Sequence, residues 1–461
     1  MDPRPIAPAG ARTVDVQRLI DDHPLSGWQW LVFAMCFLIV LLDGFDTAAI
    51  GYIAPSLIKE WGVTKPMLGP VLSAALFGLA AGALSAGPAA DRLGRKRVLT
   101  IAVLVFGLAS LASAFAADLS QLATLRFITG LGLGAAMPNA VTLMSEYCPT
   151  SRRSTLTNLM FCGFPLGAAC GGFLAAWMIP QWGWRSVLVL GGIAPLLLTL
   201  AMVALLPESV RFLVTRRQSV ERIRAALARI AGARVHDYDR FTLSETRVVT
   251  NERGGLAQVM ARPYRLGTLM LWTAYFMGLV IFYGLINWMP LLLKEAGLEP
   301  RTATLISALF PLGGIGAVFF GWLMDRFEPN RLLALGWALT SVAIFSIGQL
   351  VGQVGLLVVS VFLAGVLMNT SQSSLAPLAA AFYPTNGRAT GVAWMMGVGR
   401  FGGIAGSFLV AQLNLMQASI GTVFTVVAIP ALIAAAALWV KRGTDRATDP
   451  DDEPAASALA H

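Results

Sequence analysis

Long apolar stretches dominate the chain, and shorter polar stretches separate them. A transmembrane helix needs about 20 mostly apolar residues, and twelve runs in the sequence meet that requirement. We therefore predict an all-α membrane protein with twelve transmembrane helices. The runs cover residues 28–54, 66–90, 97–117, 121–145, 154–179, 185–206, 266–290, 302–324, 331–350, 354–380, 388–414 and 418–440.

The longest internal polar stretch lies between the sixth and seventh runs, and it divides the helices into two sets of six. This division predicts two halves joined by a central loop, with a polar tail at each end. The predicted segments are an N-terminal tail at 1–27, a first half at 28–206, the loop at 207–265, a second half at 266–440 and a C-terminal tail at 441–461.

Composition supports a lipid environment. Of the 461 residues, 56% are hydrophobic and only 13% are charged, whereas soluble domains carry roughly 25% charged residues. The net charge of +9 does not indicate nucleic-acid binding, because the basic residues lie between the apolar segments. The four cysteines show no metal-binding spacing, and no metal or cofactor site is predicted.

The distribution of basic residues predicts the orientation. With both termini in the cytoplasm, 27 of the 34 Lys and Arg residues lie inside and five lie outside. Cytoplasmic loops carry such an excess, so we expect a multi-pass protein of the cytoplasmic (inner) membrane. Within the arginine-rich loop, the pattern over 220–231 predicts an amphipathic helix on the inner membrane surface.

Three short segments recur in the second half at offsets of 234 or 235 residues. The repeat predicts two structurally similar six-helix halves, with the substrate site between them near mid-membrane. The matching pairs are 55–62 with 290–297, 87–92 with 321–326, and 149–153 with 384–388.

The segment GPAADRLGRKR at 87–97 resembles the loop 2–3 signature of the major facilitator superfamily. Its weaker copy at 321–331 keeps the Asp-Arg pair but departs at Glu328 and Pro329. Arg126, followed by three glycines at alternate positions, is similar to the helix-4 motif of the superfamily. The resemblance implies a twelve-helix transporter that works by alternating access.

A narrower resemblance lies in the first helix, at Asp43-Gly44-Phe45-Asp46. Together with Arg126 and Arg400, it is similar to the aromatic acid:proton symporter family. That resemblance implies proton-coupled uptake of benzoate-type and hydroxybenzoate-type anions by a monomer without a cofactor.

Four charged residues lie within the predicted spans, and such residues are rarely kept without a function. We predict that Arg400 binds the substrate carboxylate, because its planar fork matches a carboxylate with two hydrogen bonds. Asp43 and Asp46 are predicted to carry protons and to contribute to the substrate site, and Arg126 is predicted to tune or neutralise one of them. Two structural alternatives stay open: Asp46 and Arg126 form an ion pair of the scaffold, and Arg400 only bridges helices.

A second group of residues lies at the cytoplasmic ends of the helices. We interpret it as a latch that closes the inner side, although the same residues could instead be determinants of loop topology. The predicted gate consists of Gly87, Asp91, Arg92, Gly94, Glu146, Asp325, Arg326 and Arg388.

Polar residues of the second half, Asn287 and Gln372, are candidates for binding a ring hydroxyl. The sequence leaves two alternative functions open: transport of another organic acid, and drug:proton antiport. The second alternative rests on the glycine-rich segment 163–172, which is similar to the helix-5 motif of drug antiporters. The absence of a phosphate-binding GxxxxGK[ST] motif argues against ATP-driven transport, and no constellation typical of an enzyme is present.

Overall fold

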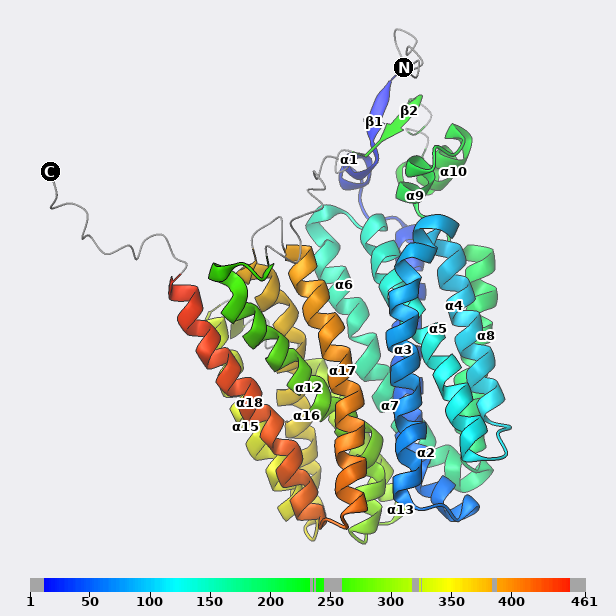
Figure 1. Ribbon diagram of the computed structural model, residues 1–461. Coiled ribbons are helices and arrows are strands. Elements are labelled where there is room, and N and C mark those ends of the chain that lie inside the picture. The colour runs from blue at the N-terminus through cyan, green and yellow to red at the C-terminus, as the bar shows by residue number, and fades with distance from the viewer. Residues whose placement is uncertain are drawn as a thin grey trace, which may run out of the picture.

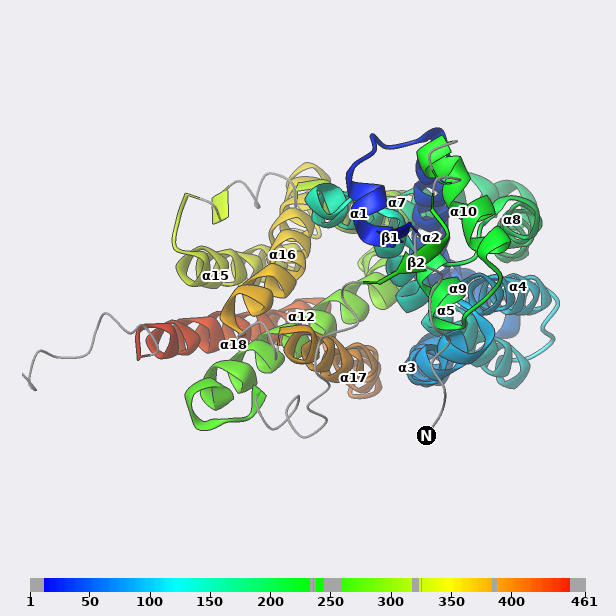
Figure 2. The ribbon, with the colours of Figure 1, turned by 90° about the horizontal axis from the view of Figure 1, so that it is seen from above.

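The structure is a computed structural model. It describes residues 12–232, 235, 238–243, 259–316, 323–324, 326–383 and 388–447. Almost all of this part of the chain is helical. Its helices form two bundles that lie side by side, the first running from blue to cyan and the second from green to red (Figures 1 and 2).

Each bundle contains six of the predicted spans. In the first bundle, the fifth span is split at Cys162 into two helices, α6 and α7. The helices are α2 (Gly27–Trp61), α3 (Lys65–Leu93), α4 (Arg95–Ser113), α5 (Leu119–Tyr147), α6 (Arg153–Phe161), α7 (Gly163–Trp182) and α8 (Arg185–Leu205). In the second bundle they are α12 (Arg262–Glu295), α13 (Pro300–Leu312), α15 (Pro329–Gln349), α16 (Val354–Phe382), α17 (Arg388–Leu415) and α18 (Ile420–Ala447).

Ten helices in the described part of the chain are long and apolar enough to cross a membrane. The other two predicted spans are α17, which has 28 residues, and α13. A 3-10 turn at Gly313–Gly316 extends α13 as far as the segment 317–322, which lies outside the described residues. The predicted fold class, with twelve helices in two similar halves, is confirmed.

The first helix of each half is longer than predicted. We expected α2 to end at residue 54 and α12 at residue 290, but both continue through a proline into a polar turn and end at Trp61 and Glu295. The 35 residues of α2 span about 50 Å at 1.5 Å per residue. An apolar run predicts only the part of a helix that lies in the hydrocarbon core, so the polar extensions were missed.

Contacts between the halves gather at the end away from α1 (Val16–Asp21), α9 (Val210–Thr215) and α10 (Val220–Ala231). Lys65 and Glu295 form an ion pair of 2.5 Å across the junction. Gly51 of α2 packs directly on α12, where an added Cβ would lie 2.4 Å from the carbonyl oxygen of Ile286. Within the described residues, the ends of the two halves away from α1, α9 and α10 are therefore in contact with each other.

The glycine-rich segment of α7 has a packing role. A Cβ added at Gly167 would lie 1.8 Å from the carbonyl oxygen of Leu41 in α2. Small residues allow such close helix contacts in membranes. The packing of α7 on α2 therefore explains these glycines without an antiport function.

The polar segments next to the first half form a small folded cap. Strand β1 (Thr13–Asp15) pairs in parallel with β2 (Arg240–Thr242) of the central loop. The apolar side chains of α10 are buried in the protein, in a cluster with those of α1. The prediction of a helix lying on the membrane surface is therefore wrong, because protein rather than lipid covers its apolar face.

The cap is tied to the loop that follows α5. Asp21 accepts hydrogen bonds from the backbone N–H of Thr150 at 2.7 Å and from its hydroxyl at 2.9 Å. Gln17 donates to the carbonyl oxygen of Cys148 at 3.2 Å. Slight burial alone would raise the pKa of Asp21. The two hydrogen bonds from Thr150, a third from Gln17 and the charge of Arg153 outweigh this effect and lower the pKa below its usual value.

Candidate functional site

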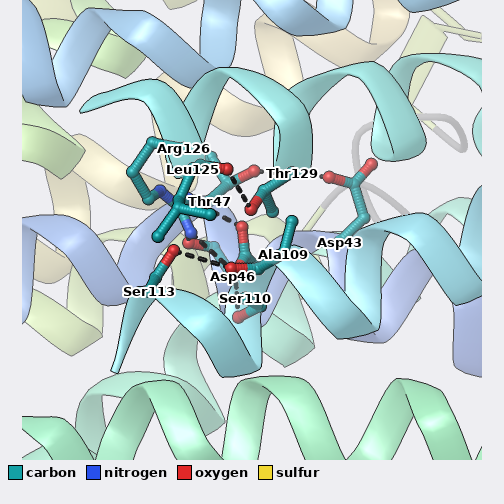
Figure 3. A network of polar contacts seen from close by, with 9 residues as sticks. All are labelled: Asp43, Asp46, Thr47, Ala109, Ser110, Ser113, Leu125, Arg126 and Thr129. Carbon is teal, nitrogen blue, oxygen red and sulfur yellow. Dashed lines mark hydrogen bonds and ion pairs between the residues drawn. The ribbon is translucent and has the colours of Figure 1, made fainter. Parts of the chain in front are cut away.

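A fully buried ion pair joins the first span, α2, to the fourth span, α5. Arg126 of α5 donates from Nη1 to Oδ1 of Asp46 at 2.8 Å and from Nη2 to Oδ2 at 2.7 Å (Figure 3). Both residues are 0% exposed. The two parallel hydrogen bonds are the bidentate geometry that makes an arginine–carboxylate pair strong.

Further hydrogen bonds surround this pair. The hydroxyl of Ser110 in α4 donates to Oδ1 of Asp46 at 3.0 Å, and Nη2 of Arg126 also reaches the backbone oxygen of Asp46 at 3.2 Å. The neighbouring hydroxyls of Ser113 and Thr129 donate to backbone carbonyls of their own helices. Asp46 is thus bound by partners from two other helices and forms an electrically neutral unit with Arg126.

Asp43 lies three residues earlier on α2 and has different surroundings. It is 2% exposed, and the hydroxyl of Thr47, one turn on, donates to it at 3.3 Å. No lysine, arginine or histidine in the described part of the chain comes within ion-pair distance of Asp43. Its carboxylate does interact electrostatically with Asp46 and with Arg400 over a longer range.

Arg400 of α17 reaches across the junction between the halves. Its Nη1 donates to the backbone oxygen of Leu79 in α3 at 3.3 Å. The guanidinium is half-buried and interacts electrostatically with Tyr275 and Tyr283 of α12. Asp43 and Arg400 therefore interact across the junction between the halves, whereas Asp46 and Arg126 form a neutral pair within the first half.

A narrow pocket lies beside these charges, between the two halves. It is lined by α2, α3 and α5 of the first half and by Tyr283 and Asn287 of α12. Thr47, Arg126, Tyr283 and Asn287 have polar side chains, and the remaining lining residues are aliphatic. The space open to the centre of a water molecule is about 10 Å³, which is roughly enough for one water.

The two candidates for binding a ring hydroxyl differ in position. Asn287 lines the pocket. Gln372 of α16 is not among the pocket residues; its amide donates to the backbone oxygen of Tyr275 at 3.3 Å and lies against Gly278. Sequence reasoning missed Thr47 as a hydrogen-bond donor to Asp43, although its spacing of four residues from Asp43 placed it on the same helix face.

Two residues of the predicted gate, Glu146 and Gly94, lie where the end of α5 meets the α3–α4 turn and the segment after α8. Glu146 lies 3.8 Å from Nε of Arg95 and accepts a short hydrogen bond from the hydroxyl of Ser209. Gly94 joins α3 to α4 with φ of 100°, a conformation that favours glycine. Glu208, which was not predicted, accepts from the backbone N–H of Lys96 at 3.0 Å.

The remaining gate residues are only partly described. The side chain of Arg92 is exposed, and its backbone oxygen accepts a hydrogen bond of 3.4 Å from Arg216. Arg326 begins the turn before α15, where its N–H donates to Leu323 at 3.1 Å. Asp325 lies outside the described residues, and Gly87, Asp91 and Arg388 are described only as parts of their helices, α3 and α17.

The described residues contain no group of three or more His, Cys, Asp or Glu side chains arranged to hold a metal ion. What the site offers instead is a buried carboxylate, an arginine fork and a pocket with aliphatic walls.

Known proteins resemble the chain over almost all of its length. The profile of the Major Facilitator Superfamily matches residues 36–320 and 271–460. The 4-hydroxybenzoate transporter PcaK of Pseudomonas aeruginosa is 50% identical over 438 residues, which cover 95% of this chain and 97% of that protein. The gallate transporter of Pseudomonas putida is 48% identical, with 92% and 94% covered.

A solved structure shares the fold at much lower sequence identity. The xylose transporter XylE from E. coli, in an inward open conformation, superposes with a TM-score of 0.70. The match covers 89% of this chain and 95% of XylE at 19% identity.

Proposed function

Because the chain belongs to the Major Facilitator Superfamily, we propose that it carries small aromatic carboxylates of the benzoate and hydroxybenzoate class into the cell together with protons. The protein is a membrane transporter and not an enzyme. The names of the relatives that are 48–50% identical to it support the substrate class. The observation that carries the proposal is the position of Arg400 and Asp43 at the junction of the halves.

In this proposal Arg400 binds the carboxylate of the substrate. Its guanidinium has five N–H donors in a planar fork, and the hydrogen bond to Leu79 uses only one of them. The half-buried position gives the fork access to the space between the halves, where a carboxylate can accept two parallel hydrogen bonds. The aliphatic walls and Tyr283 provide an apolar surface for the ring.

Asp43 carries the proton in the same scheme. When ionised, its carboxylate attracts Arg400 and competes with the substrate anion for that charge. Protonation of Asp43 removes the competition, so binding of the proton favours binding of the anion. Asp46 takes a structural role instead, because Arg126 and Ser110 already occupy its carboxylate.

Transport proceeds by alternating access. The cap formed by α1, α9 and α10 carries much of the arginine-rich loop, and we place it with both termini in the cytoplasm of a bacterial inner membrane. With the outer ends of the halves in contact, this structure corresponds to an inward-facing state. Rocking of one half against the other then exposes the central site to the outside.

The test is uptake by purified protein in liposomes, with the pH gradient and the membrane voltage imposed separately. Wild-type protein should concentrate labelled 4-hydroxybenzoate under a pH gradient. Asp43→Asn should abolish this accumulation but retain exchange of substrate. Undiminished accumulation by Asp43→Asn would show that another group carries the proton.

A second pair of variants tests the carboxylate site. Arg400→Lys should lose most uptake, since a point charge does not replace the two-pronged fork. The matched control is Arg185→Lys, which makes the same change at an exposed ion pair with Glu60 on the outer surface. Equal uptake by the two lysine variants would contradict the role given to Arg400.

A further inference from the structure

The wall of the pocket beside the charged residues contains a further polar group, the side chain of Asn287. Leu79, whose oxygen accepts from Arg400, and Thr47, which donates to Asp43, both line the pocket. These contacts place Arg400 and Asp43 beside the pocket, and Arg126 also lines it. Asn287 lies four residues beyond Tyr283 on α12, toward the closed outer side.

The side chain of Asn287 is held in one orientation. It is 2% exposed, and its Nδ2 donates to the hydroxyl oxygen of Ser407 in α17 at 2.7 Å. Ser407 is itself fully buried, and its backbone oxygen accepts from the indole of Trp288 at 3.1 Å. This bond occupies the amide nitrogen, so the carbonyl oxygen is the group of Asn287 that can accept a hydrogen bond from a ligand in the pocket.

The spacing along α12 fits an aromatic ring. Residues four apart lie on the same face of a helix, and they are separated by a rise of about 6 Å. That rise is close to the distance across a benzene ring from a carboxyl carbon to an oxygen in the para position. A ring whose carboxylate lies at Arg400, near Tyr283, would therefore bring its para substituent to Asn287.

We propose that Asn287 determines substrate specificity by accepting a hydrogen bond from the ring hydroxyl of a hydroxylated aromatic carboxylate. This inference rests on the proposed function. A carbonyl oxygen accepts and does not donate, so it selects a phenolic hydroxyl and leaves benzoate or a para-methoxy ring without a partner. Sites that bind a substrate hydroxyl in this way reject analogues that lack it, because a buried polar group is then left unpaired.

The pocket is closed in this structure, and its walls belong to different halves. The first half contributes Ile50, Leu72 and Leu76, whereas Tyr283 and Asn287 belong to the second. Separation of the outer ends would part these walls. The hydroxyl subsite is thus available when the substrate loads from outside, and its closure expels the substrate toward the cytoplasm.

The test compares uptake of labelled 4-hydroxybenzoate and labelled benzoate in liposomes. The ratio of kcat/KM for the two substrates should fall about ten- to hundredfold in Asn287→Leu and Asn287→Ala, the loss expected for one buried hydrogen bond. Asn414→Leu is the matched control, because Asn414 is also buried but donates to the backbone of its own helix. The control should keep the wild-type ratio.

Equal losses for both substrates in the Asn287 variants would assign Asn287 to helix packing and overturn the proposal. A competition assay on the wild-type protein does not depend on any variant being stable. Unlabelled 4-methoxybenzoate should inhibit 4-hydroxybenzoate uptake no better than benzoate does, and inhibition as strong as that by 4-hydroxybenzoate would also overturn it. Wild-type protein that takes up neither acid would refute the proposed function itself, and this inference with it.

Discussion

Neutralising one member of the buried ion pair should destabilise the protein far more than the same change at the neighbouring aspartate. In Asp46→Asn, the guanidinium of Arg126 stays in a site that is 0% exposed and loses its counter-charge. Breaking a buried pair in this way costs about 3–5 kcal/mol. At 1.4 kcal/mol per factor of ten, that cost lowers the ratio of folded to unfolded protein by roughly two to four orders of magnitude.

Two further variants make this expectation specific. Asp43→Asn is the matched control: it changes the same chemical group three residues away, where no ion pair exists among the described residues, and it should stay close to wild-type stability. The double variant Asp46→Asn/Arg126→Gln removes both charges and should recover part of the loss, since no uncompensated charge remains.

Thermal unfolding in detergent, followed by the fraction of monodisperse protein after heating, measures wild-type protein, these three variants and the single variant Arg126→Gln, which completes the cycle. The interaction energy is the difference between the double variant and the sum of the two single variants. If Asp46→Asn were as stable as Asp43→Asn, the pair would contribute nothing to the scaffold. Asp46 would then again be a candidate for carrying a proton.

Three other predictions concern the ends of the helices. Lys65→Gln should raise the ratio of outward-open to inward-facing protein by no more than about fivefold, because a half-exposed ion pair contributes under 1 kcal/mol. Distances between spin labels on the outer ends of the halves measure this ratio. Glu295→Gln removes the other partner of the pair and should give the same shift. A cysteine at Thr64 should react with an impermeant thiol reagent from outside, and one at Thr215 only in inverted vesicles; the opposite result would reverse the orientation. The lowered pKa of Asp21 means that its contribution to docking of the cap is present above about pH 4 and is lost as the pH falls through the folded value. In wild-type protein, proteolysis of the N-terminal segment should be faster in acid than at neutral pH. In the Asp21→Asn variant, this segment should be cleaved equally fast at acid and at neutral pH.

Apolar run length and internal repetition were enough to predict the fold. Each half starts with a helix whose apolar core was recognised, and whose predicted end lay just before Pro55 or at Pro290. Proline is tolerated inside helices that are packed in a membrane protein, so composition alone does not locate those ends. The docking of α10 on α1 depends on a long-range contact, and an amphipathic pattern does not distinguish a protein surface from a lipid surface.

The site could be predicted as a set of residues but not as a set of pairs. Asp43 and Asp46 lie on one face of a helix. The sequence does not indicate which of the two forms the ion pair with Arg126. The choice depends on the rotation of α2 in its bundle, which also brings Ser110 of α4 against Asp46. Glu208 was missed for a similar reason, because a polar residue in a loop becomes distinctive only when the loop docks at a helix end.

The pairing of charges bears on how many protons would move with each anion. Asp46 and Arg126 cancel, which leaves Asp43 and Arg400 as the charges that can respond to substrate at the centre of the site. When the site is empty these two balance each other, and an arriving carboxylate adds one negative charge in a low-dielectric region where uncompensated charge is costly. One proton on Asp43 restores neutrality, whereas a second proton would have to break the Asp46–Arg126 pair. The geometry therefore favours one proton per carboxylate, a cycle in which the loaded site is neutral and the membrane voltage does no work on it.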